Sequence, residues 1–105
     1  MLAHDRRSDP ELIYANAAAL RLWQTTWGDL IGLPSRLTAP ESVRRGRQRA
    51  LIQAHHQEAI SNYSGRRVSR SGRQFMIHNA RIWSLRDDEQ TICGQAASIS
   101  EWWWI

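Results

Sequence analysis

The sequence predicts one domain of the α+β class, in which helices from the middle of the chain cover one face of an antiparallel sheet. The chain has 105 residues, which is enough for a single domain with one modest core. Patterns typical of helices lie between residues 16 and 59, and three strand-like runs follow from Ile60 to the C-terminal end. Strands joined by tight turns pair antiparallel, and helices grouped between strands pack together on the sheet.

A short strand and a helix are expected near the N-terminus. Asp9-Pro10 marks a turn, and residues 12–14 (Leu-Ile-Tyr) have the composition of a strand. Asn16 can cap a helix that starts at Ala17, because its side chain accepts hydrogen bonds from the free N–H groups of the first turn. The segment has an apolar face and ends at glycine and proline; the residues concerned are Leu20, Trp23 and Trp27, then Gly32 and Pro34.

A second, longer helix is predicted from about Ala39 to about Ala59. Residues 38–41 (Thr-Ala-Pro-Glu) have the form of a capping box, with Thr38 as the cap and Glu41 reaching back to it. The apolar stripe of this helix is thin, so only one edge is expected to pack inward; it consists of Val43, Ala50, Leu51 and Ala54. The other faces carry four arginines, which are Arg44, Arg45, Arg47 and Arg49.

The period changes to two from Ile60 onward, which predicts three consecutive strands. They span residues 60–69, 73–85 and 91–99, and the turns between them are Ser71-Gly72 and residues 87–90. In the second strand, Phe75 and Ile77 have one parity, whereas Ala80 and Ile82 have the other. A regular strand cannot bury both pairs on one face, so a β-bulge is expected near His78-Asn79.

Composition indicates which partners, disulfides and membrane segments to expect. The formal net charge is +4 and all 14 cationic residues are arginine. This composition would suit phosphate or carboxylate partners, but we interpret it first as a reflection of genome composition. A single cysteine, Cys93, allows no internal disulfide and is interpreted as a small buried hydrophobe. No apolar run is long enough to span a bilayer, and charged residues follow Met1 too soon for a signal peptide. We therefore expect a cytoplasmic protein without a membrane partner.

No motif for catalysis or metal binding stands out. The neighbouring His55 and His56 point about 100° apart on a helix, so they do not chelate one ion, and the acidic residues 87–89 lie in a turn. There is no glycine-rich phosphate loop. We therefore expect a protein that is not an enzyme and has no metal site. The arginine run of the long helix leaves nucleic-acid binding as a disfavoured alternative, because no DNA-binding motif accompanies it.

Segments along nearly the whole chain resemble the MEKHLA domain, a family of PAS-like domains. In order, these segments are Asp9-Pro10, residues 13–16 and 18–20, residues 33–39, residues 62–65, Val68-Ser69, Gly72-Arg73, Phe75, Ala80, Ile82-Trp83 and residues 94–97. The resemblance implies a five-stranded antiparallel sheet with helices across one face, often with a small cavity between them. Domains of this fold serve as sensors of small ligands or as dimerisation modules.

The chain departs from the family pattern at three places. Members usually begin with a helix and a first strand, whereas here only Leu2-Ala3-His4 remains as the end of a truncated first strand. A shortened strand leaves its neighbour with open N–H and C=O groups, so we predict a homodimer. Glu58-Ala59 stands where the family tends to have glycine, and the cysteine motif that attaches flavin in photosensory PAS domains is absent. The cofactor, if any, is left open.

A candidate ligand site follows from Arg66, at whose position the family tends to have isoleucine. It shares parity with Ile60 and Val68, so it would face the core if the even positions of its strand do. A buried arginine needs an anion, which suggests an anion-sensing pocket. The alternative is a twisted or bulged strand that lets Arg66 reach water. The residues assigned to the pocket or its wall are Tyr14, Trp23, Arg66, His78 and Trp83.

The three tryptophans at the C-terminal end, Trp102, Trp103 and Trp104, are a candidate interface. Three consecutive side chains in a strand cannot all face inward, and exposed large apolar groups commonly mark a contact surface. The leading hypothesis is a small-molecule sensor that acts through protein association, and the alternative is a ligand-free interaction or dimerisation module. A cavity of ~300 Å³ or more would favour the sensor, and a core filled by side chains would favour the interaction module.

Overall fold

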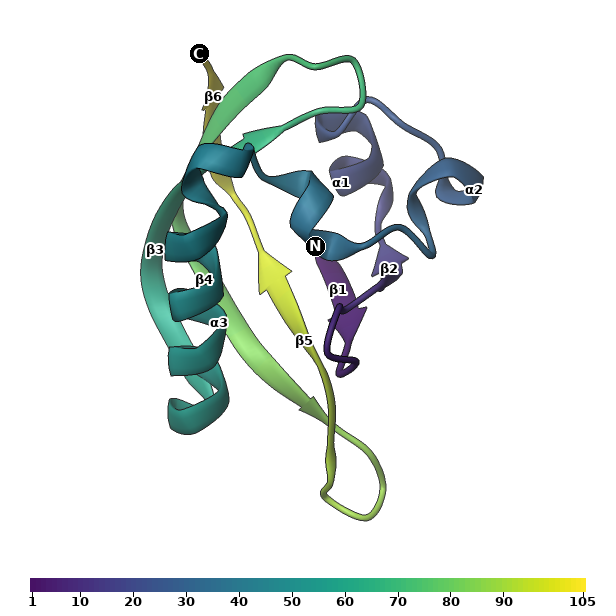
Figure 1. Cartoon of the computed structure of the whole chain (residues 1–105), viewed down its shortest axis with the longest axis vertical. Coiled ribbons are helices and arrows are strands. Elements are labelled where there is room, and N and C mark those ends of the chain that lie inside the picture. The colour runs from purple at the N-terminus through teal and green to yellow at the C-terminus, as the bar shows by residue number, and fades with distance from the viewer.

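A six-stranded antiparallel sheet forms the body of the molecule, whose computed structural model describes residues 1–105 (Figure 1). The strands lie in the spatial order β2-β1-β5-β4-β3, and β6 pairs with the N-terminal half of β4. Their bounds are β1 Leu2–Asp5, β2 Leu12–Ala15, β3 Ala59–Val68, β4 Gln74–Arg86, β5 Ile92–Ser98 and β6 Glu101–Trp104. The predicted α+β fold is confirmed, as are the three neighbouring antiparallel strands β3, β4 and β5. The short β6 was not predicted as a separate strand.

Helical segments occupy the middle of the chain, as expected. They are α1 Ala17–Leu22, α2 Trp27–Leu30, the 3₁₀ turns η1 Ser35–Thr38 and η2 Glu41–Val43, and α3 Arg44–Gln57. Figure 1 shows α3 crossing the sheet over β3 and β4, while α1 and α2 lie beside β1 and β2. The cover of the sheet therefore has two parts, and the central strand β5 runs between them.

The predicted cap of α1 is confirmed, because Asn16 Oδ1 accepts a hydrogen bond from Ala19 N at 3.0 Å. The expected apolar face of this segment is wrong in part. The helix ends at Leu22 and the chain reverses at Gln24, whose φ is 55°. Trp23 is therefore buried in the core, whereas Trp27 starts a separate helix and is 48% exposed.

The predicted capping box of the long helix is also wrong. Ala39 is extended, since the residue before a proline avoids the helical region. Thr38 lies in η1 and donates its hydroxyl to Ser35 O at 2.7 Å, so it caps nothing. The helix starts five residues later than expected, at Arg44, and no side chain caps it. Its inward edge is as thin as predicted, with Ala50 and Ala54 as the buried residues.

Two bulges interrupt the β3–β4 pairing. Ile77 pairs with Gly65 and Ala80 with Tyr63, so β4 carries one extra residue at His78-Asn79, and the bulge predicted there is confirmed. It lets Phe75, Ile77, Ala80 and Ile82 all be buried. A second extra residue lies on β3, because Ile60 and Tyr63 pair with Ile82 and Ala80. Asn62 and Asn79 have positive φ angles of 59° and 57°, which asparagine tolerates better than most residues.

The first strand is short, but both of its edges are paired. Strand β1 pairs with β2 on one side and with residues Gly94–Ala97 of β5 on the other. The open neighbouring edge that motivated the predicted homodimer is therefore absent along β5. The hydrophobic core packs against these strands. In the core, the rings of Trp23 and Phe75 meet edge to face, with their centroids 5.1 Å apart.

Candidate functional site

A small cavity lies between the sheet and its helical cover. Its volume is about 40 Å³, and 12 of its 17 lining residues are hydrophobic. A cavity needs roughly 10–15 Å³ per water molecule, so this one has room for a ligand of only a few heavy atoms. It is well below the ~300 Å³ typical of pockets for larger ligands. The lining residues come from β1 (Leu2, Ala3, His4), β2 (Leu12), α1 and η1 (Trp23, Thr38), α3 (Arg47, Leu51), β3 (Tyr63, Arg67), β4 (Ile77, Ala80, Ile82) and β5 with its end (Gln95, Ala96, Ala97, Ile99).

Arg67 is the most deeply buried charged residue of the cavity, with 6% of its surface exposed. The bulge at Asn62 sets its direction, because the extra residue brings Tyr63, Gly65 and Arg67 to the inner face of β3. Its Nη1 donates to Arg66 O at 2.8 Å, and its Nη2 donates to the Tyr63 hydroxyl at 3.3 Å. Gly65 makes room for this pair, since a Cβ there would lie 2.8 Å from the Tyr63 hydroxyl oxygen.

Arg47 reaches the same cavity from α3. It precedes Ala50, Leu51 and Ala54 by three, four and seven residues, so it lies on the inward edge of the helix. Its Nη2 donates to Ser35 Oγ at 2.8 Å. Burial, followed by the nearby charge of Arg67, lowers the pKa of Arg47 to about 10. The expectation that Arg47 lies on an outer face of the helix is therefore wrong.

Neither the buried Arg67 nor the half-buried Arg47 has an anionic partner. The ion pairs of the protein join other residues, namely Arg7 with Asp5 and Glu11, Arg36 with Asp9, and Arg86 with Glu58. No aspartate or glutamate lines the cavity. Burying a charge without a counter-charge is energetically costly. An anion bound between the two guanidinium groups would supply that counter-charge.

His4 contributes a buried polar atom without a partner. The residue is 8% exposed, and its Nε2 is the one buried side-chain nitrogen or oxygen that lacks a hydrogen bond. Its Nδ1 lies 2.7 Å from Asp5 O, which can only accept, so Nδ1 carries the proton. Burial is the main cause that lowers the pKa of His4, which favours the neutral ring. Nε2 therefore carries a lone pair that no group of the protein satisfies, on a residue that lines the cavity.

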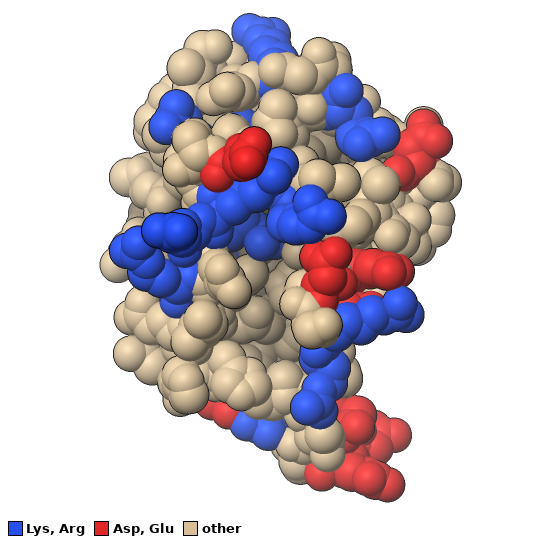
Figure 2. All heavy atoms as spheres, in the orientation of Figure 1, with Lys and Arg blue, Asp and Glu red and all other residues tan.

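A wide polar groove adjoins the cavity and shares four lining residues with it: His4, Arg47, Leu51 and Gln95. Its volume is about 700 Å³, and it runs between α3 and the β1–β2 loop. Figure 2 shows the arginines gathered over this face, with acidic side chains beside them. The arginines of the groove are Arg6, Arg7, Arg36, Arg44, Arg45 and Arg47.

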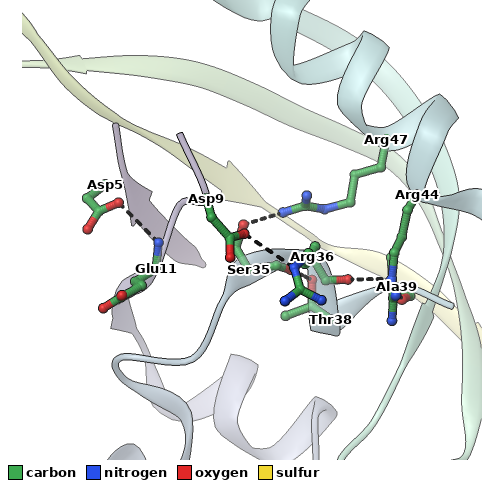
Figure 3. Close-up of polar contacts among 9 residues, drawn as sticks. All are labelled: Asp5, Asp9, Glu11, Ser35, Arg36, Thr38, Ala39, Arg44 and Arg47. Atoms are coloured by element: carbon green, nitrogen blue, oxygen red, sulfur yellow. Dashed lines mark hydrogen bonds and ion pairs between the residues drawn. The ribbon is translucent and has the colours of Figure 1, made fainter. Parts of the chain in front are cut away.

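The acidic residues of the groove do not neutralise Arg47. Asp5 and Asp9 pair with Arg7 and Arg36, respectively, and the third acidic residue, Glu41, forms no ion pair. Figure 3 shows Arg47 extending from α3 towards Ser35, while Arg44 donates from its Nε to the carbonyl oxygens of Arg36 and Ala39, at 3.1 Å each. The groove thus leads from solvent to the cavity past mainly basic side chains.

The structure does not bring the five predicted ligand-site residues together. Trp23 lines the cavity, and its Nε1 donates to Thr38 O at 3.4 Å. Arg66 is exposed, so the orientation towards the core is wrong and the bulged-strand alternative holds. The remaining three do not line the cavity: Tyr14 is exposed and contacts Trp27, exposed His78 bonds Ser64, and half-buried Trp83 follows the inward-facing Ile82.

Sequence reasoning missed His4, Arg47 and Arg67. Two of them left a signal: Arg47 is in phase with the apolar stripe of its helix, and an asparagine within a strand, Asn62, is a residue type that accommodates a bulge. His4 left none, because its burial comes from the position of β1 inside the sheet. Cys93, predicted to be buried, is exposed on β5 and does not line the cavity.

The three C-terminal tryptophans lie on β6, which pairs only with β4. Trp102 and Trp103 are 41% and 50% exposed, so the expectation that at least one faces solvent is confirmed. Trp104 is half-buried. Its ring centroid lies 5.5 Å from that of Phe75, and the guanidinium of Arg73 lies over its ring.

Comparison with solved structures identifies the class of fold as that of PAS and LOV domains. A PAS domain of a protein from Colwellia psychrerythraea superposes with a TM-score of 0.83 at 14% identity, over 95% of this chain and 82% of that one. The LOV domain of the photoreceptor Aureochrome1 in its dark structure gives 0.71 at 18%, over 95% and 72%. The photo-excited blue-light photoreceptor Vivid gives 0.72 at 16%, over 95% and 76%.

The family follows from the sequence profile. The family model of the MEKHLA domain matches residues 1–104, and the chain belongs to the MEKHLA domain family. A comparison with curated proteins finds no match. None of the helices is both long and apolar enough to cross a membrane.

Proposed function

We propose that this PAS-like domain binds a small molecule in the cavity beneath α3 and works as a sensing module through association with other proteins. The proposal rests chiefly on one observation, the convergence of two guanidinium groups and an unpartnered imidazole nitrogen on a mostly apolar cavity. Polar groups inside proteins are normally hydrogen-bonded, so a buried group without a partner needs an explanation, and a bound molecule provides one. The adjoining groove supplies a route from solvent to these groups.

A blocked cavity provides the test. Ala96 is 2% exposed and lines the cavity, so Ala96→Leu would fill the space with three further carbon atoms. Titration of ¹⁵N-labelled protein with n-propanol, a neutral probe of suitable size, should shift the amide resonances of Ala80 and Ala96 in the wild type. The same probe should leave the amide of Ala80 unchanged in the filled variant. If no small probe shifts these resonances, and native mass spectrometry finds no retained small molecule, the proposed function fails.

A ligand-free homodimerisation module is the second candidate, and β6 is the feature that favours it. This strand pairs on one side only and exposes two tryptophans, a combination that suits pairing with a second copy. Sedimentation velocity at micromolar concentration should then show a dimer that Trp103→Glu converts to a monomer. A monomeric wild type would remove this candidate and leave the ligand-binding proposal intact.

A further inference from the structure

The charge of the cavity defines the kind of ligand that it can take. Arg47 and Arg67 reach it from different elements, α3 and β3, and the charge of Arg67 is close enough to lower the pKa of Arg47. His4, the other titratable group with a buried polar atom, does not offset these charges, because it is neutral or positive in either protonation state. An anionic ligand would therefore convert two isolated charges into hydrogen-bonded ion pairs.

Both guanidinium groups keep donors for a ligand. Each has five N–H groups. Arg47 uses one of them on Ser35, and Arg67 uses two, on Arg66 O and on the Tyr63 hydroxyl. The remaining N–H groups suit a carboxylate, whose two oxygens match the planar fork of arginine. The hydrophobic lining favours an organic anion over a strongly hydrated inorganic one.

His4 adds a second requirement. Because its Nδ1 proton is committed to Asp5 O, Nε2 can only accept a hydrogen bond in the neutral ring. A bare carboxylate next to that lone pair would be repelled, whereas a hydroxyl group would satisfy it. His4 and Arg47 both lie where the cavity meets the groove, so one small molecule can address both.

We propose that the cavity binds a small hydroxycarboxylate, whose carboxylate is held by Arg47 and Arg67 and whose hydroxyl group donates to His4 Nε2. This inference rests on the proposed function, because it names the ligand class of the same cavity. The volume of about 40 Å³ limits the molecule to a skeleton of two or three carbon atoms. Glycolate is therefore the probe of choice.

Three matched probes separate the two requirements. Sodium glycolate carries both groups, sodium acetate lacks the hydroxyl, and ethylene glycol lacks the carboxylate. Titrations of the labelled wild type at pH 7.5 and constant ionic strength should show glycolate shifting the amides of Ala80 and Ala96 at the lowest concentration. Its affinity should exceed that of acetate by about tenfold, the effect of one hydrogen bond in a buried site.

Matched variants assign the contacts. Arg67→Met should weaken glycolate binding by at least about tenfold, whereas Arg66→Met, the next residue on the opposite face of β3, should leave it unchanged. Arg47→Met and Arg49→Met form an equivalent pair on α3, because Arg49 is exposed and lines neither the cavity nor the groove. His4→Phe should lower the affinity for glycolate to that for acetate. The dispersion of each amide spectrum reports whether the variant is folded, and the two arginine pairs test the carboxylate contact independently.

Two results would overturn the inference. One is glycolate binding that is no tighter than that of acetate or ethylene glycol. The other is glycolate affinity that survives both Arg47→Met and Arg67→Met. If n-propanol or ethylene glycol still shifts the cavity amides in that case, the hydroxycarboxylate is wrong and ligand binding in the cavity stands. If no probe shifts them, the proposed function fails as well.

Discussion

Arg47→Met should stabilise the ligand-free protein, although it removes a hydrogen bond. Burial and the charge of Arg67 lower the pKa of Arg47 to about 10, well below the ordinary value of arginine, and each pKa unit corresponds to about 1.4 kcal/mol. The charged form thus destabilises the folded state by roughly 3 kcal/mol. Because the folded-state pKa of this base is lowered, the destabilisation is fully present at pH 7 and is relieved only as the pH rises through about 10 and beyond.

The hydrogen bond from Arg47 to Ser35 offsets part of this amount. A bond from a charged donor contributes about 1.5–3 kcal/mol, so we expect the methionine variant to gain roughly 1 kcal/mol in free energy of unfolding. For a domain of this size that gain raises the melting temperature by about 4–8 °C. Urea unfolding at pH 7.5, followed by tryptophan fluorescence in a buffer without carboxylates, measures it. Exposed Arg45→Met is the control and should change stability by less than about 0.5 kcal/mol. An Arg47→Met variant less stable than the wild type would refute the idea that this charge is buried without compensation.

Three further predictions concern His4 and the backbone of the elements that carry the two arginines. The pKa of His4 is lowered in the folded state, so the wild type should lose stability as the pH falls below the ordinary value of 6.5, and His4→Gln should lack this component; the difference between their urea midpoints from pH 7.5 to 5 checks it. Gly65→Ala should destabilise the protein by about 1–3 kcal/mol, because its methyl group would overlap the Tyr63 hydroxyl, whereas Gly46→Ala, with nothing within 4 Å, should stabilise α3 by about 0.5–1 kcal/mol; thermal melts of the two variants would contradict this if both shifts had the same sign. Asn62→Val should cost about 1–2 kcal/mol, since a β-branched residue resists the positive φ of the bulge, while Asn62→Gly should be nearly neutral in the same unfolding assay.

The fold could be predicted because its determinants are local and repeated. The strand-like period of two that begins at Ile60 continues for about forty residues. Errors of one or two residues at the strand ends therefore do not alter the predicted pairing. The bulge on β4 was visible because four apolar residues of mixed parity bracket it. The helix start expected at about Ala39, with Thr38 as its cap, was wrong for an equally local reason, because Pro40 holds Ala39 extended.

The site was harder to predict because it depends on single residues. One extra residue at Asn62 exchanges the faces that Arg66 and Arg67 present, and no apolar pair on β3 marks that change in the sequence. Reasoning from strand parity predicted that an arginine of β3 faces the core, but it selected Arg66, the neighbour of the buried Arg67. The contribution of His4 required the three-dimensional structure, since neither its burial nor its unpartnered nitrogen follows from nearby residues.

The thin inward edge of α3 suggests how binding in the cavity could change the dynamics of this helix at the surface of the domain. Only Ala50 and Ala54 are fully buried on this helix, and small side chains give little apolar contact with the sheet. Elements held by few buried contacts open locally at a lower free energy than the rest of a domain. A ligand that links Arg47 on α3 to Arg67 on β3 would add a contact between the helix and the sheet. Protection from hydrogen exchange on binding would then be concentrated in α3, and the outer surface of that helix would report the occupancy of the cavity.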